Sequence, residues 1–222
     1  MNIKYQFAIA FFISVIALLA FSLLAFMIKA NTIVSFDSTI ITFIQSFEST
    51  TLTSIMKVFT YIGSTRFTIG LAIAVLLFLY FVLKHRIELI LFIVGIIGSA
   101  ILNKGLKYLF HRARPDLHRL IEISGFSFPS GHSMNAFTVY TLISFLLWRH
   151  ISSKLGRVLL ILISTMMVLL IGISRIYLGV HFPSDVIGGY LASGCWLAIA
   201  IWFFQRYQDR RGRREKERVR SI

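Results

Sequence analysis

The chain has 222 residues, of which 57% are hydrophobic and only 14% carry a formal charge. Ordinary soluble domains hold about 25% charged residues, so this composition excludes that class. The net charge of +14 would fit a nucleic-acid-binding protein. Because the lysines and arginines flank apolar segments instead of forming a separate basic domain, we predict no nucleic-acid partner.

Several apolar segments are long enough to cross a membrane, which requires roughly 20 mainly apolar residues in a helix. They are residues 6–28, 66–83, 88–106, 132–148, 158–175 and 186–204. The sequence therefore predicts an all-α polytopic membrane protein with six transmembrane helices. The first segment is longer than the apolar core of about 7–15 residues in a signal peptide, so we expect it to be a retained helix.

Residues 29–65, between the first two predicted spans, contain no full span but repeat apolar residues at helical spacing. These residues are Ile33, Phe36, Ile40, Ile44 and Phe47. The spacing predicts an amphipathic helix that lies in the outer membrane interface. Both a packing role and a substrate-guiding role fit such a helix.

The distribution of lysine and arginine predicts the orientation of the chain. If both termini are cytoplasmic, 14 of the 23 basic residues lie inside and 9 outside, as the positive-inside rule favours. We expect a single membrane domain over residues 1–205 and a basic cytoplasmic tail over 206–222 that contacts anionic headgroups. The predicted location is the cell membrane, and the oligomeric state is not readable from the sequence.

A first polar motif ends the third span and contains Lys107, Arg114 and Pro115. Lys107 and Arg114 are nearly two helical turns apart, so they share one face if the helix persists. Pro115, however, cannot continue a helix. Ammonium and guanidinium groups both suit a phosphate. The alternative is that they only reach toward outer headgroups.

A second motif, Pro129-Ser130-Gly131-His132, opens the fourth span. Ser130 is a good N-cap, and the free N–H groups at a helix N-terminus attract anions. Gly131 has no side chain, so a phosphate oxygen can approach its backbone. His132 falls in the first turn. An ordinary capped helix with an interfacial histidine explains the same residues.

A third motif runs from Ser174-Arg175 to His181 and Asp185. An aspartate four residues after a histidine can accept a hydrogen bond from one ring nitrogen, which leaves the other nitrogen free to attack. A structural His–Asp pair in which Asp185 caps the last span is the alternative. Arg175 beside the pair favours an anion site.

The predicted topology places all three motifs at outer ends of spans. A charge at a bilayer centre costs ~2.5–3.5 kcal/mol on insertion scales, so charges in an apolar chain indicate a function. Three cations, two histidines and one carboxylate at the same face indicate phosphoryl chemistry.

In order and internal spacing, these motifs resemble the three-part signature of the type 2 phosphatidic acid phosphatase superfamily. The motifs cover residues 107–185, and the six-helix layout extends the likeness to most of the chain. The resemblance implies phosphoryl transfer without a metal or other cofactor, through a phosphohistidine. It implies that His181 attacks phosphorus, that Asp185 orients it, and that His132 protonates the departing alcohol and then activates water.

The resemblance also implies which residues hold the phosphate oxygens. They are Lys107, Arg114, Ser130, Gly131 and Arg175. Since Asp185 is the sole acid in the three motifs, they contain no carboxylate cluster suited to magnesium.

The expected partners are a phosphorylated membrane lipid and the bilayer. The chain is similar to bacterial members that convert phosphatidylglycerol phosphate to phosphatidylglycerol and phosphate. The alternative substrate is undecaprenyl pyrophosphate, for which Arg112 and Arg119 could contact a second phosphate. Two further alternatives are a non-enzymatic lipid transporter and a vanadate-dependent haloperoxidase, although no internal repeat typical of transporters is visible.

Overall fold

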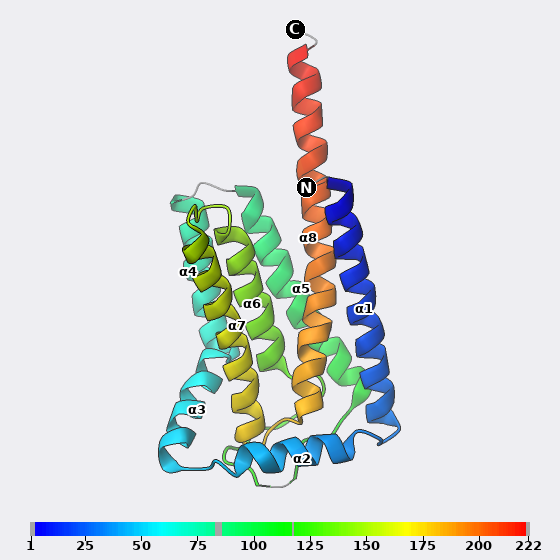
Figure 1. Cartoon of the computed structure of the whole chain (residues 1–222), viewed down its shortest axis with the longest axis vertical. Coiled ribbons are helices and arrows are strands. Elements are labelled where there is room, and N and C mark those ends of the chain that lie inside the picture. The colour runs from blue at the N-terminus through cyan, green and yellow to red at the C-terminus, as the bar shows by residue number, and fades with distance from the viewer. Residues whose placement is uncertain (1–2, 83–85, 117, 221–222) are drawn as a thin grey trace.

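A computed structural model describes residues 3–82, 86–116 and 118–220, and these form eight helices and no strand (Figure 1). The helices are α1 Ile3–Lys29, α2 Val34–Gln45, α3 Thr50–Ile62, α4 Thr65–Phe81, α5 Arg86–Phe110, α6 Gly131–Leu147, α7 Lys154–Tyr177 and α8 Pro183–Arg220. The prediction of an all-α membrane fold is confirmed.

By length and hydropathy, fewer of the described helices qualify as membrane spans than the six predicted. Length and hydropathy qualify α1, α5, α7 and α8 among the described helices, and the bent pair of α3 and α4 makes a fifth if counted as one span. The helices α4 and α6 have 17 residues each, at the short end of what crosses a bilayer. The count of six stays a prediction, and the predicted end of the second span at residue 83 lies outside the described residues.

The helix α6 is the centre of the bundle, because it packs against α5, α7 and α8, while α1 lies along α8 (Figure 1). An apolar core that includes Phe92, Leu142 and Leu197 joins α5, α6 and α8. Many large apolar side chains on the outer surface of the bundle are exposed, as expected where lipid is the solvent.

Residues 29–65 form two helices and not a single one, because Ser49 starts a new helix. The Ser49 Oγ accepts a hydrogen bond from the N–H of Leu52 (3.3 Å) and caps α3. The helix α2 lies across one end of the bundle (Figure 1), and its location in the outer membrane interface stays a prediction. Its residue Ile41 is buried against the bundle, whereas Phe36, which shares the predicted apolar spacing, is exposed.

The ends of the helices divide between the two ends of the bundle. The helices α5 and α7 finish, and α6 and α8 begin, at the end that α2 covers (Figure 1). At the opposite end α1 begins, and α8 continues well past the bundle. All three sequence motifs therefore lie at the same end of the molecule.

Candidate active site

The end of α5 differs from the helix that the first motif would allow. The helix finishes at Phe110, and the following His111 has a φ of 47°. Lys107 is therefore helical but Arg114 lies in the loop, so the two do not share a helical face. The long side chain of Arg114 still reaches the α7–α8 connection, where its Nη1 donates to the carbonyl of Val180 (2.8 Å).

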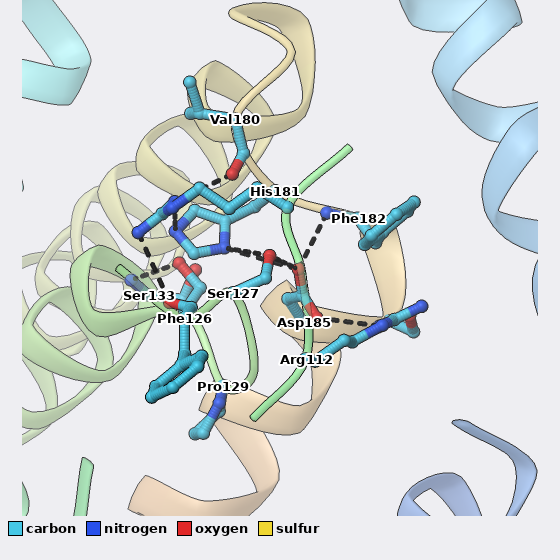
Figure 2. Close-up of polar contacts among 12 residues, drawn as sticks. Arg112, Phe126, Ser127, Pro129, Ser133, Val180, His181, Phe182 and Asp185 are labelled. Atoms are coloured by element: carbon cyan, nitrogen blue, oxygen red, sulfur yellow. Dashed lines mark hydrogen bonds and ion pairs between the residues drawn. The ribbon is translucent and has the colours of Figure 1, made fainter. Parts of the chain in front are cut away.

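His181 and Asp185 form a buried pair, in which the Nδ1–Oδ2 distance is 3.3 Å, at the long end for a hydrogen bond. Both residues are at most 2% exposed, and Figure 2 shows the imidazole edge facing the carboxylate. On the other side of the ring, Nε2 lies 3.0 Å from Nη1 of Arg114. Because a guanidinium only donates, Nε2 carries the lone pair and Nδ1 carries the proton toward Asp185.

The surroundings of His181 keep its ring neutral. Burial lowers the pKa of His181 to about 3, although the hydrogen bond and charge of Asp185 act in the opposite direction. The cations Arg175 and Arg114 lower this pKa further. A neutral imidazole with a directed lone pair is the form that can attack phosphorus.

Asp185 has hydrogen-bond donors on both oxygens. Its Oδ2 accepts from the Ser127 hydroxyl (2.5 Å) and from the backbone N–H of Phe182 (2.9 Å), and its Oδ1 accepts from Nη1 of Arg112 (2.7 Å) (Figure 2). The Phe182 contact is the reciprocal cap typical of the third residue in a helix. Asp185 therefore caps α8 and also faces His181, so the two interpretations of the motif are compatible.

Three cations approach the same region. Arg175, in the last turn of α7, is 1% exposed, donates through Nη1 to Thr60, and has no partner for its Nε among the described residues. Lys107 donates to the carbonyl of Phe126 (2.5 Å). Burial lowers the pKa of Arg114. Desolvated like charges of this kind are stabilised by an anion bound between them.

The second motif begins α6 as predicted. Ser130 is fully buried, its Oγ accepts from the N–H of Ser133 (3.4 Å), and its own N–H donates to the carbonyl of Asp185 (3.0 Å). This last bond joins the start of α6 to the start of α8. A Cβ at Gly131 would lie 3.1 Å from Oδ1 of Asn103, so a side chain of α5 lies against this glycine.

His132 completes the cluster from the first turn of α6. The charges of Arg175, His181, Arg114 and Lys107 all act on its ring, so residues from all three motifs lie within electrostatic reach of one another. The α3 cap residue Gly63 lies against the same ring, since a Cβ there would be 3.3 Å from the His132 Cδ2. The predicted site residues are thus gathered at one place, while their individual roles stay predictions.

Three contacts of this site were not predicted from the sequence. Ser127 bonds Asp185, and Arg112 bridges Asp185 and Asp37 with distances of 2.7 and 2.8 Å. A sequence pattern that points to Asp37 does exist, because it is an acid within an amphipathic segment. A buried acid requires a partner. Ser127 had no signal beyond its polarity. Arg119, which we considered with Arg112 for a second phosphate, pairs with Asp116 (3.5 Å).

The described residues contain no group of three or more His, Cys, Asp or Glu side chains placed to hold a metal ion. Apart from the Asp185 carboxylate at Nδ1 of His181, the charged groups that act on the two imidazoles are cations. Such a donor set suits the oxygens of a phosphate ester.

Fold and site together define an integral membrane protein, a helical bundle with a buried cluster of histidines and cations at one end. The chain belongs to the PAP2 superfamily, whose family model matches residues 88–209. It is 34% identical over 203 residues to phosphatidylglycerophosphatase B of Bacillus subtilis (strain 168), which covers 90% of this chain and 96% of the relative. It is also 32% identical over 162 residues to "Putative undecaprenyl-diphosphatase YbjG" of Escherichia coli (strain K12), covering 67% of this chain and 77% of that one.

Two solved structures share the fold. The crystal structure of a transmembrane PAP2 type phosphatidylglycerolphosphate phosphatase from Bacillus subtilis superposes with a TM-score of 0.81 and 32% identity, covering 87% of this chain and 96% of that chain. The crystal structure of Aquifex aeolicus LpxE gives a TM-score of 0.62 and 29% identity, covering 75% and 94% respectively. The similarity therefore extends well beyond the three motifs.

Proposed function

We propose that this protein is an integral membrane lipid phosphatase that hydrolyses phosphatidylglycerol phosphate to phosphatidylglycerol and phosphate. The observation that carries the proposal is the buried, neutral His181, with Nδ1 toward Asp185 and Nε2 toward Arg114. The names of the relatives from Bacillus subtilis support the choice of substrate.

In the first step, the phosphate oxygens bind the cationic groups of Lys107, Arg114 and Arg175, and Arg114 moves its contact from Nε2 to the phosphate. The Nε2 lone pair of His181 attacks phosphorus, a P–N bond forms and the P–O bond to the lipid breaks. A protonated His132 gives its proton to the departing alkoxide. The negative charge of the bound phosphate favours this protonated form.

In the second step, the now neutral His132 removes a proton from water as the water oxygen attacks phosphorus. The P–N bond breaks, inorganic phosphate forms and the lone pair returns to Nε2 of His181. The phosphorylated ring is cationic, and its Nδ1–H donates to Asp185, which stabilises that charge. Ser130 and the Gly131 backbone, at the N-terminus of α6, complete the contacts to the phosphate.

We infer that the site opens to the outer face of the cell membrane and that both termini are cytoplasmic. The positive-inside count supports this orientation. The site and the start of α1 lie at opposite ends of the bundle (Figure 1). The domain over residues 1–205 and the tail over 206–222 stay a proposed division, and α8 continues without a break from Pro183 to Arg220.

Undecaprenyl pyrophosphate is the second candidate substrate, because of the similarity to the Escherichia coli relative. The cation contacts favour the first candidate. Arg112 is held between two buried carboxylates, so its guanidinium is not free to bind a second phosphate.

The test is phosphate release by the purified protein in detergent. We expect the highest kcat/KM with phosphatidylglycerol phosphate, compared with phosphatidic acid, undecaprenyl pyrophosphate and diacylglycerol pyrophosphate. The matched control is His181→Asn, which keeps a polar side chain but lacks the attacking nitrogen. An absence of phosphate release from every lipid, together with lipid flipping in liposomes, would favour the transporter class instead.

A further inference from the structure

Arg112 lies between two buried carboxylates that come from different helices. Its Nη2 is 2.8 Å from Oδ2 of Asp37 in α2, and its Nη1 is 2.7 Å from Oδ1 of Asp185 in α8. Asp37 is 1% exposed and Asp185 is fully buried. A planar guanidinium can donate to two acids at once in fixed directions, which an ammonium cannot do as well.

Asp37 is also held by the first turn of α8. Its Oδ1 accepts from the backbone N–H of Ser184 (2.9 Å), and its Oδ2 accepts from the Ser184 hydroxyl (2.6 Å). The guanidinium carbon of Arg112 lies 4.1 Å from the centre of the Phe182 ring. Asp37 therefore contacts Ser184, which precedes Asp185 in the chain, and Arg112, which donates to Asp185.

Negative and positive groups alternate in this network, in the order Asp37, Arg112 and Asp185. A carboxylate buried without a partner is strongly unfavourable, and here Arg112 balances two of them. Because Oδ1 of Asp185 is taken by Arg112, its Oδ2 is the oxygen that faces His181. Asp37 offsets part of the Arg112 charge, so the negative charge of Asp185 still acts on the His181 ring.

We propose that Asp37 and Arg112 are positioning residues for the hydrolysis, which fix the Asp185 carboxylate so that its Oδ2 receives the Nδ1–H of His181. This inference rests on the proposed function. It gives the interfacial helix α2 a part in the chemistry beyond covering the bundle. The effect is largest when His181 carries the phosphoryl group, since the cationic ring then depends on an ionised and correctly aimed Asp185.

The test uses Asp37→Asn and Arg112→Lys in single-turnover experiments, with enzyme in excess over phosphatidylglycerol phosphate in mixed micelles. With enzyme at a saturating excess, the single-turnover rate constant is that of the correctly folded molecules, so a misfolded fraction does not lower it. We expect both variants to be slower by about 10–100-fold, the rate equivalent of losing roughly one hydrogen bond to a charged group. A rate constant within about twofold of the wild type in Asp37→Asn would overturn the proposal.

The matched controls are Asp116→Asn in the outer loop, where the Asp116 side chain is exposed, and Arg149→Lys at the opposite end of the bundle. We expect their rate constants to stay close to that of the wild type. A loss in the controls as large as in Asp37→Asn would mean that such substitutions slow the enzyme wherever they lie, and the specific role of Asp37 would be wrong.

A double variant tests whether Asp37 acts through Asp185. If it does, Asp37→Asn adds no further loss to Asp185→Asn, because the group being positioned is already neutral. If the rate losses of the two single variants multiply in the double variant, the positioning role is wrong, while the proposed function stays intact. A wild-type protein that releases no phosphate would instead overturn the proposed function and the positioning role with it.

Discussion

His181 is a neutral imidazole enclosed by charged side chains, and this environment connects its chemistry with stability. Its pKa is about 3 in the folded protein against 6.5 for the free side chain. Between these pH values the unfolded chain binds a proton that the folded chain does not bind. The stabilising effect is therefore fully present above pH 6.5 and is lost as the pH falls toward 3.

We expect the free energy of unfolding to fall on acidification by up to about 1.4 kcal/mol per pH unit from this residue. Thermal unfolding in detergent between pH 7 and pH 4 measures the effect. His181→Gln should lose less stability than the wild type over this range. Identical pH dependence in His181→Gln and wild type would contradict the assignment.

The two histidines should differ in what their replacement does. We expect His181→Ala to abolish turnover, because no other group can form the P–N bond. His132→Ala should slow turnover by about 10²–10⁴-fold, the usual range for a lost general acid or base. An aryl phosphate with a nitrophenol leaving group needs no proton to depart, so His132→Ala should lose less in the phosphoenzyme-forming step with that ester. Full activity of His181→Ala would rule out the nucleophile.

The donor set of the proposed phosphate site predicts insensitivity to chelators. Lys107, Arg114 and Arg175 supply positive charge, and both oxygens of Asp185 already accept hydrogen bonds. We expect phosphate release to be the same with and without EDTA. A loss of activity under EDTA that magnesium restores would show that the cations alone do not stabilise the transferred group.

At the scale of the elements, the contact between α8 and the loop before α6 places Ser127 against Asp185. A Cβ at Gly188 would lie 2.4 Å from the ring of Phe128, which is fully buried and adjacent to Ser127. We expect Gly188→Ala to be destabilised by about 1–3 kcal/mol through overpacking, and to lose activity as Ser127 moves from Asp185.

The control for this substitution is Gly70→Ala in α4, where a Cβ would meet no atom within 4 Å. Since alanine favours a helix more than glycine does, Gly70→Ala should leave the melting temperature unchanged or raise it slightly. Melting temperatures in detergent compare the two variants. Equal melting temperatures of Gly188→Ala and Gly70→Ala would mean that the Phe128 ring can move aside without a loss of stability.

The elements themselves were predictable to different degrees. Long apolar runs such as 88–106 and 158–175 are found within α5 and α7, because an apolar segment of this length is stable in a bilayer only as a helix. The division of residues 29–65 into α2 and α3 was not predicted. It depends on the Ser49 cap and on Ile41 being buried against the bundle, and apolar spacing alone does not encode either contact.

At the scale of the whole molecule, the orientation in the membrane is the main prediction. Single cysteines at Asp116→Cys and Gly212→Cys, in a Cys195→Ser background, report the two ends of the bundle. We expect a membrane-impermeant thiol reagent to label Asp116→Cys in intact cells and Gly212→Cys only after permeabilisation. The reverse pattern would overturn the outward-facing site.

The sequence by itself determined the helical membrane class and the segments that carry polar residues at span ends. It also determined the His181–Asp185 pair, because four residues at the start of a helix bring the two side chains together locally. Only the tertiary structure decided that Asp37 and Arg112, 75 positions apart, support that pair, and that Thr60 contacts Arg175. Such contacts depend on how loops and helices pack across the end of the bundle, and no local pattern of apolar or polar residues specifies that packing.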